Sequence, residues 1–471
     1  MRREKPQTGG SGKAHTGALV AVIVLIVVSL LVGAGVLAQP DRVARLLGAP
    51  TVDWRRVVPP APPGPVLPAA MTDAPVPTAD ALSRTLAEPL SDPALGHASV
   101  AVVDVATGQR LFDKAADTAS LPASTTKLLT ATAVLAARGP AYRLTTRAVA
   151  GPNPGDVVLV GAGDPTLAAG ANATYADAAR LDDLAAQVKQ ALGGNAPSRV
   201  IVDGALFTGP TAGPGWDDDA TTGYGAPITA LMIDGARTSP VPPHGFASRS
   251  TQPDLAAGQA LAAALGLPGG AVTRGSAPAE AKPLGTVASP PMVRLVEEML
   301  VESDNVIAEC LARQVALARN QPASFAGAAA AVTAVLAELG LAIAPGVLVD
   351  GSGLSRDDRL SPALLTGLLA LDAKGERPEL RAVFNGLPVA GYSGTLRDRY
   401  RKSTTGGKAA GVVRAKTGTL TPGVSAIAGV VVDADGRTLA FAVLATVGDN
   451  AFPAQDALDR FAATLAACGC R

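Results

Sequence analysis

Ser124-Thr125-Thr126-Lys127, Ser303-Asp304-Asn305 and Lys416-Thr417-Gly418 follow one another, in that order, along this chain of 471 residues. Together the three segments supply a serine hydroxyl beside an amine, a second hydroxyl beside an amide, and a lysine followed by a threonine hydroxyl. Each segment alone is weak evidence, because Ser, Thr, Lys and Gly are common residues. The ordered set of three is strong, and it predicts an enzyme that uses a serine nucleophile.

The first segment places a candidate nucleophile beside a candidate base. Ser124 and Lys127 are three residues apart at the start of a helix predicted to run to about Ala137, so their side chains share one face. Lys127 can take the serine proton only as a neutral amine, and burial together with a second cation, Lys416, lowers an amine pKa. The alternative for this segment alone is an N-capping serine followed by an ordinary surface lysine.

The second segment lies inside a predicted helical region, 290–318, or at a break in it. Ser303 offers a hydroxyl that can relay a proton to a leaving amine, and Asn305 offers an amide that can orient Lys127 and a substrate carbonyl. The alternative is a polar helix break or a cap without a catalytic role.

The third segment sits at the end of a predicted strand and has the chemistry of an anion site. Lys416 and Thr417 can bind a carboxylate, and Gly418, without a side chain, lets another backbone approach the strand edge. The backbone amide of Thr419 can then form an oxyanion hole with the amide of Ser124. The alternative is a strand that ends in an ordinary turn.

Composition excludes several other classes of function. The 40 Lys and Arg residues balance the 40 Asp and Glu residues, and aromatic residues are only 3% of the chain, so no nucleic-acid partner is expected. With only three histidines and three cysteines, we expect no metal site, no histidine-based triad and no cofactor. Lysine is therefore the expected base.

The N-terminal region predicts an exported protein. Four basic residues lie in 1–16, a predicted cytoplasmic tail, and the apolar segment 17–38 is long enough to span a bilayer once. The alternative is a cleaved signal that ends at Val36-Leu37-Ala38. A Pro-rich linker, 39–78, would then separate the membrane from a catalytic body outside it. Export permits disulfides, but the sequence leaves the cysteine pairing open.

The remaining chain predicts an α/β (α+β) fold, in which a catalytic domain of 79–150 and 286–471 is interrupted by an α/β lobe, 151–285. A hairpin before a helical middle and antiparallel strands after it indicate an antiparallel sheet covered by helices. The predicted strands are 98–105, 110–112, 157–160, 199–203, 411–415, 425–433 and 438–447. The predicted helices, besides those above, are 175–192, 323–339, 361–373 and 454–467.

At these segments the sequence resembles the class C, low-molecular-weight penicillin-binding proteins, which are serine D-Ala-D-Ala carboxypeptidases and endopeptidases of peptidoglycan. Three further segments carry the resemblance: Gly161-Ala162-Gly163-Asp164-Pro165-Thr166-Leu167, Asp350-Gly351-Ser352-Gly353-Leu354-Ser355-Arg356 and Ser393-Gly394-Thr395-Leu396. The resemblance extends from about residue 80 to the end. It implies the transpeptidase fold shared by penicillin-binding proteins and serine β-lactamases.

The resemblance also implies residue roles. Ser124 would be the nucleophile that forms the acyl-enzyme, Lys127 its base, Ser303 and Asn305 the second motif, and Lys416-Thr417-Gly418 the third. The expected reaction is hydrolysis of the D-Ala-D-Ala bond of peptidoglycan stem peptides, with β-lactam antibiotics as covalent inhibitors.

Two alternatives stay open. A β-lactamase would need a dedicated base that activates water; Glu302 and Glu309 lie near the second motif, but nothing assigns them that role. The other alternative is a non-catalytic protein that binds the cell wall.

Overall fold

The computed structural model describes residues 73–217, 223–239, 245–268, 271–400 and 406–470. The predicted tail and membrane span, and the linker up to residue 72, lie outside these ranges. Within them, no helix is both long and apolar enough to cross a membrane. All described residues belong to one unit, Pro65–Arg471.

The first of two sheets is antiparallel and has five strands, in the order β2-β1-β10-β9-β8. Its strands are β1 (His97–Asp104), β2 (Arg110–Lys114), β8 (Arg414–Leu420), β9 (Val424–Val432) and β10 (Thr438–Thr446). Strands β9 and β10 are apolar on both faces, as expected for strands covered on both sides. Ala428 and Val430 of β9 enter one hydrophobic cluster, whereas Ile427 and Val431 enter another.

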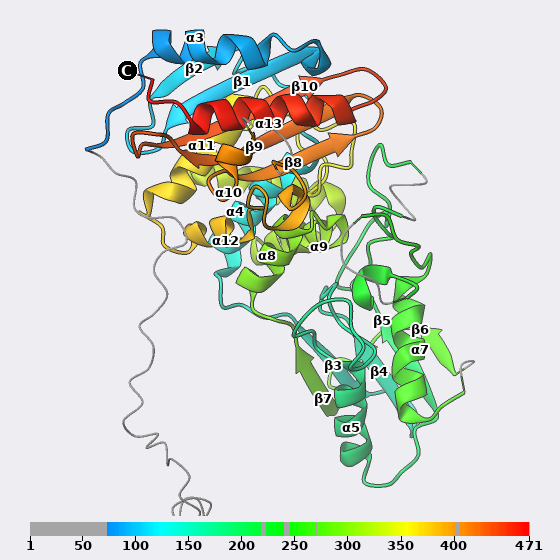
Figure 1. Cartoon of the computed structure of the whole chain (residues 1–471). Helices are drawn as coiled ribbons and strands as arrows, with labels where there is room; N and C mark the ends of the chain where they lie inside the picture. The colour runs from blue at the N-terminus through cyan, green and yellow to red at the C-terminus, as the bar shows by residue number, and fades with distance from the viewer. Residues whose placement is uncertain (1–72, 218–222, 240–244, 269–270, 401–405, 471) are drawn as a thin grey trace, which may run out of the picture. The chain divides into compact units, whose positions relative to one another are not determined.

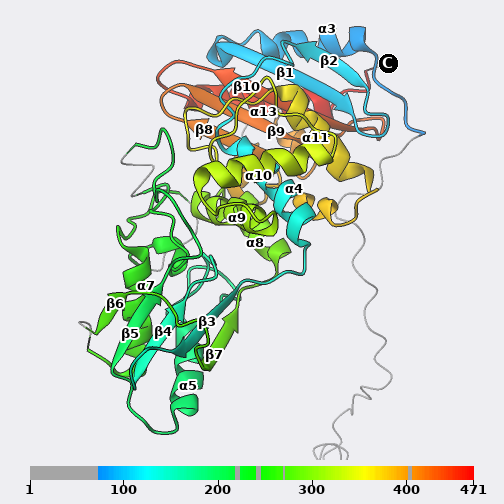
Figure 2. The same cartoon turned by 180° about the vertical axis from the view of Figure 1, so that it is seen from behind.

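Helices cover both faces of this sheet. On one face, α13 (Phe452–Ala466) lies against β9 and packs beside α3 (Ala79–Leu90) (Figure 1). On the other face, α11 (Pro362–Lys374) contacts β1, β9 and β10, and the view from behind shows it with the remaining helices of this domain (Figure 2). The predicted antiparallel sheet covered by helices is confirmed.

The helices on the second face form the larger hydrophobic cluster and carry two of the three motifs. They are α4 (Lys127–Arg138), α8 (Met292–Val301), α9 (Asn305–Ala318), α10 (Phe325–Glu338) and the short α12 (Val383–Gly386). α4 packs against α8, α9, α10 and α11, and its residues are buried from Lys127 through Leu135. The predicted helix over 290–318 is therefore two helices with a break at 302–304.

The second sheet is mixed and has the strand order β6-β5-β4-β3-β7. Its strands are β3 (Thr145–Ala150), β4 (Asp156–Val160), β5 (Arg199–Asp203), β6 (Val272–Arg274) and β7 (Pro283–Ala288). β4, β5 and β6 are parallel, whereas β3 pairs antiparallel with β4 and β7. Two helices, α5 (Leu181–Leu192) and α7 (Pro253–Leu265), pack against this sheet around their own hydrophobic cluster.

Several elements differ from the sequence predictions. Strand pairing assigns β3 and β7 to the second sheet, so the predicted lobe boundaries at 150/151 and 285/286 leave β3 outside the lobe and cut through β7. The helix predicted from 175 begins at Leu181, because Tyr175 instead turns into a buried polar cluster and Asp177 has a positive φ of 57°. Helix α7 was not predicted. Cys468 pairs with Cys470, and Cys310 is a buried free thiol.

Candidate active site

The serine of the first motif lies in a single 3₁₀ turn, Ala123–Thr126, and α4 begins only at Lys127. The predicted helix from Ser124 is therefore wrong in its first turn, although the spacing argument holds. The Lys127 Nζ lies 2.9 Å from the Ser124 Oγ, which is hydrogen-bonding distance. Ser124 is partly exposed, whereas Lys127 is fully buried.

Lys127 is held by oxygen atoms from two other segments of the chain. Its Nζ donates to the Asn305 Oδ1 at 2.5 Å and to the backbone carbonyl of Ser352 at 2.8 Å. Burial lowers the pKa of Lys127 to about 8, and the nearby Asp350 and Glu309 carboxylates partly oppose that shift. An amine with this pKa is neutral in a substantial fraction of molecules near pH 8, so it can accept a proton.

The carbonyl that faces Lys127 belongs to a tightly hydrogen-bonded loop. The Asp350 carboxylate accepts from the backbone amides of Ser352, Gly353 and Ser355 at 3.1, 2.6 and 2.7 Å, and from the Trp216 indole at 2.9 Å. Gly353 has a φ of +80°, and a Cβ there would overlap the Ala123 carbonyl. The loop therefore fits closely against the serine turn. The chemistry of the residues did not predict its role, and only the family resemblance singled it out.

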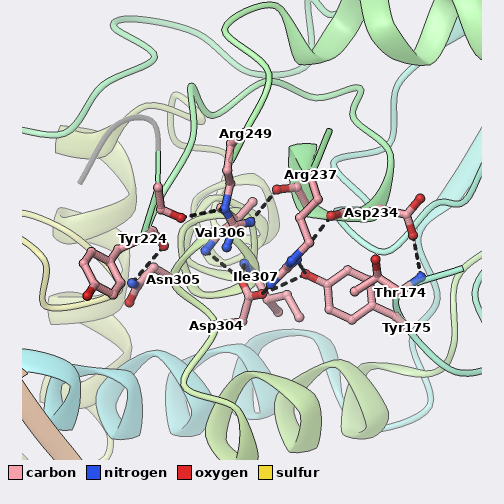
Figure 3. Close-up of polar contacts among 12 residues, drawn as sticks. Thr174, Tyr175, Tyr224, Asp234, Arg237, Arg249, Asp304, Asn305, Val306 and Ile307 are labelled. Atoms are coloured by element: carbon pink, nitrogen blue, oxygen red, sulfur yellow. Dashed lines mark hydrogen bonds and ion pairs between the residues drawn. The ribbon is translucent and has the colours of Figure 1, made fainter. Parts of the chain in front are cut away.

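The second motif occupies the break between α8 and α9. Ser303 has a φ of 58°, and its Oγ accepts a hydrogen bond from the Lys416 Nζ at 2.9 Å. Asp304 is the N-cap of α9, where its Oδ1 accepts from the backbone amides of Val306 and Ile307 (Figure 3). Asn305 is the first residue of α9 and reaches Lys127. The break thus presents Ser303 and Asn305 to the two lysines.

The third motif lies within β8, an edge strand, which begins and ends later than the strand predicted over 411–415. Pairing with β9 continues through Lys416, Thr417 and Gly418. Lys416 is fully buried and also donates to the Thr417 carbonyl at 2.8 Å. Burial and the positive charge of Lys127 lower the pKa of Lys416 well below its usual value. The Thr417 hydroxyl contacts the Thr395 hydroxyl at 2.7 Å, a contact the sequence did not predict.

Gly418 allows β8 to approach the serine turn. A Cβ at this position would lie 2.8 Å from the Pro122 carbonyl oxygen and 3.2 Å from the Ser124 backbone nitrogen. The next residue, Thr419, accepts a hydrogen bond from the Gln455 Nε2 through its hydroxyl at 3.3 Å. The predicted role of glycine as the site of a close backbone approach is confirmed.

The structure therefore brings all three motifs together. A hydroxyl and a buried amine of lowered pKa are in contact, and a second hydroxyl and amine lie beside them, which is the arrangement needed for covalent acyl transfer. Among the residues that the structure describes, no cluster of three or more His, Cys, Asp or Glu side chains could hold a metal ion.

Comparisons with known proteins identify the family. The sequence matches the D-Ala-D-Ala carboxypeptidase 3 (S13) family over residues 82–241 and 240–465. It is 44% identical over 412 residues to a carboxypeptidase of Mycobacterium tuberculosis, covering 86% of this chain and 87% of that protein. It is 42% identical over 430 residues to carboxypeptidase DacB of Mycolicibacterium smegmatis, covering 89% of this chain and 92% of that protein.

The fold is also that of a solved penicillin-binding protein. The crystal structure of penicillin binding protein 4 from Haemophilus influenzae superposes with a TM-score of 0.65 at 24% identity, covering 82% of this chain and 98% of that one. This likeness confirms the predicted fold class. The chain belongs to the D-Ala-D-Ala carboxypeptidase 3 (S13) family and is a serine-type carboxypeptidase.

Proposed function

We propose that the enzyme removes the terminal D-alanine from peptidoglycan stem peptides through an acyl-enzyme on Ser124. The observation that carries this proposal is the 2.9 Å contact between the Lys127 Nζ and the Ser124 Oγ. Lys127 is fully buried, and burial lowers its pKa to about 8, so the amine can take the hydroxyl proton near neutral pH.

In the proposed reaction, the Ser124 Oγ attacks the carbonyl carbon of the penultimate D-alanine while its proton passes to Lys127. The backbone amides of Ser124 and Thr419 stabilise the negative oxygen of the tetrahedral intermediate. The bond to the terminal D-alanine then breaks, and its leaving nitrogen receives a proton through the Ser303 hydroxyl. Water attacks the resulting ester and releases the shortened peptide and the free serine.

The carboxylate of the departing D-alanine would bind at the third motif. Lys416 supplies an ammonium group there and Thr417 a hydroxyl, both on β8 beside the serine turn. An arriving carboxylate raises the pKa of Lys416, because an opposite charge favours the protonated amine. Substrate binding therefore favours a charged Lys416, and the repulsion between the two amines then favours a neutral Lys127.

The same site would react with a β-lactam, whose strained amide and carboxylate occupy equivalent positions. The enzyme would release that adduct slowly, since neither nearby glutamate is available to activate water. Glu309 is fully buried and accepts from the backbone amide of Gly351, whereas Glu302 is near Arg397, at 3.9 Å. A penicillin adduct turned over within seconds would instead identify a β-lactamase.

For location, we propose that segment 17–38 anchors the enzyme in the cytoplasmic membrane with the catalytic domain outside it. The apolar length of this segment and the basic residues before it support the proposal. A cleaved signal peptide is the alternative, and N-terminal sequencing of the mature protein distinguishes the two. An intact N-terminus in the membrane fraction is the expected result.

The test of the reaction compares the wild-type protein with Ser124→Ala. Mass spectrometry should detect conversion of a pentapeptide to a tetrapeptide by the wild type, and the variant should lose roughly 10⁴-fold or more of that turnover. Labelling by a fluorescent penicillin should likewise disappear in the variant. Equal labelling of both proteins would rule out Ser124 as the acylated residue. A cross-linked dimer supplied as a parallel substrate measures endopeptidase activity.

A further inference from the structure

We infer that two arginines of the inserted lobe, Arg237 and Arg249, are positioning residues that hold the second catalytic motif in place. The inference rests on the proposed function, because it assigns them a role in that same acylation. Neither arginine touches Ser124 or Lys127 in any described contact. Each acts through one residue of the second motif, Asp304 or Asn305.

The first connection runs from Arg237 to Asp304. The Arg237 Nη2 lies 3.1 Å from the Asp304 Oδ2, and the two side chains are 1% and 0% exposed. Burial alone would raise the pKa of Asp304, but the charges of Arg237 and Arg249, with the hydrogen bonds from the Ile307 amide and the Tyr175 hydroxyl, together lower the pKa to about 2. Asp304 is thus a buried carboxylate that depends on cations supplied by the other lobe. Removing one partner of such a pair leaves an uncompensated buried charge.

Tyr175 completes this connection. Its hydroxyl donates to the Asp304 Oδ2 at 2.7 Å and accepts from the Arg237 Nη1 at 2.5 Å (Figure 3). The other oxygen of Asp304 is already occupied by the amides that begin α9. With both oxygens engaged, the carboxylate cannot rotate. The residues on either side of it, Ser303 and Asn305, are fixed as a consequence.

The second connection runs from Arg249 through a loop to Asn305. The Arg249 Nε donates to the Gly223 carbonyl at 3.0 Å, and its Nη1 donates to the Gly235 carbonyl. The next carbonyl in that loop, of Tyr224, accepts from the Asn305 Nδ2 at 3.1 Å. This contact directs the Asn305 Oδ1 toward Lys127, and it makes the orientation of the catalytic amide depend on the lobe.

The two connections share one structural origin. Arg237 and Arg249 lie opposite each other in an isolated antiparallel bridge, so both side chains extend from the same short two-stranded segment. Asp234, at the start of this segment, accepts from the backbone amide of Thr174 at 2.7 Å and so ties it to the Tyr175 loop. The lobe is therefore a structural part of the catalytic centre as well as a neighbour of it.

The experiment compares four variants in the full-length protein: Tyr175→Phe, Arg237→Lys, Arg237→Met and Arg249→Met. Arg199→Gln is the matched control, because Arg199 pairs with the buried Asp156 at 2.8 Å in the same lobe and has no described contact with the second motif. For each protein we would measure kcat and KM on a D-Ala-D-Ala peptide, the acylation rate with a fluorescent penicillin, and the melting temperature.

Because displacement of a catalytic group by about 1 Å costs up to about 100-fold in rate, we expect Arg237→Met and Arg249→Met to lower kcat and acylation at least about tenfold. KM should change little, and Arg237→Lys should recover part of the lost rate. Tyr175→Phe, which keeps the buried ring, should lose several-fold and serves as the test if an arginine variant does not fold.

Folded Tyr175→Phe and arginine variants that acylate at the wild-type rate would overturn the inference, whatever their melting temperatures. So would an equal loss of rate in Arg199→Gln, because that would show a general effect of lobe stability. Labelling of the wild type at Ser124 is measured first. If it is absent, the proposed function fails, and the variants then say nothing about the two arginines.

Discussion

The rate at which Ser124 is acylated should rise with pH along a single sigmoidal limb of the pH–rate profile, with its midpoint near pH 8. Only the neutral form of Lys127 can take the hydroxyl proton, and burial lowers the pKa of this amine to about 8. The neutral fraction is then about 9% at pH 7 and about 50% at pH 8, so the rate should increase about fivefold over this interval. For a lysine with an unperturbed pKa, the neutral fraction at pH 7 would be about 300-fold smaller.

A substitution behind the lysine tests the physical cause. The Glu309 carboxylate raises the pKa of Lys127, and burial raises the pKa of Glu309 itself to about 7, so Glu309 is largely ionised at pH 8. Glu309→Gln removes that charge but keeps an acceptor for the Gly351 amide. The limb should therefore move to lower pH, and acylation at pH 7 should become faster.

The assay is stopped-flow acylation by a fluorescent penicillin between pH 6 and 9.5, with the carboxylate of the probe ionised throughout. Glu88→Gln, which makes the same charge change at an exposed position on α3, is the control and should leave the limb in place. A rate that does not change between pH 6 and 9 would refute the role of Lys127 as base. A limb that moves upward in Glu309→Gln would refute the electrostatic argument.

Two further predictions concern packing and stability. Gly418→Ala should lower the acylation rate about tenfold or more, because the added Cβ would lie 2.8 Å from the Pro122 carbonyl oxygen and displace β8 from the serine turn. Thermal unfolding should show that this variant still folds. Lys127→Met should be inactive, and chemical denaturation should show the wild type gaining stability relative to it between about pH 8 and 10.5. In that window an unfolded lysine, with a pKa of 10.5, binds more protons than the folded one, so the free energy of unfolding of the wild type rises with pH by about 3 kcal/mol relative to the variant. A wild type that instead gained stability as the pH was lowered would contradict this reasoning.

The elements that the sequence predicted well are those specified locally. Strands β4, β5, β9 and β10 are short apolar runs between turn residues, and α10 and α11 have serine caps, Ser324 and Ser361, that accept from the first turn. The three motifs were also recognisable in sequence, because their chemistry depends on the order of neighbouring residues. Their meeting in space follows from the fold.

The features that the sequence did not predict depend on distant partners. The predicted strand over 411–415 extends in the structure through Lys416, Thr417 and Gly418 as far as Leu420, because β8 pairs with β9 over that length. Tyr175 and its neighbours have helical propensity, but the contact with Asp304, 129 residues away, holds Tyr175 outside a helix. The Ser352 carbonyl is invisible in a sequence, since every residue has one, and only the three-dimensional loop directs it toward Lys127.

The pairing of β1 with β10 governs when the enzyme can first become active. Synthesis proceeds from the N-terminus, so β1 has no partner on this side until β10, far along the chain, has been made. The lysine strand β8 likewise arrives after the serine turn and the whole inserted lobe. A nascent chain therefore contains the serine nucleophile long before it contains the lysine of β8, and a chain that stops before β10 lacks the central strand of the first sheet.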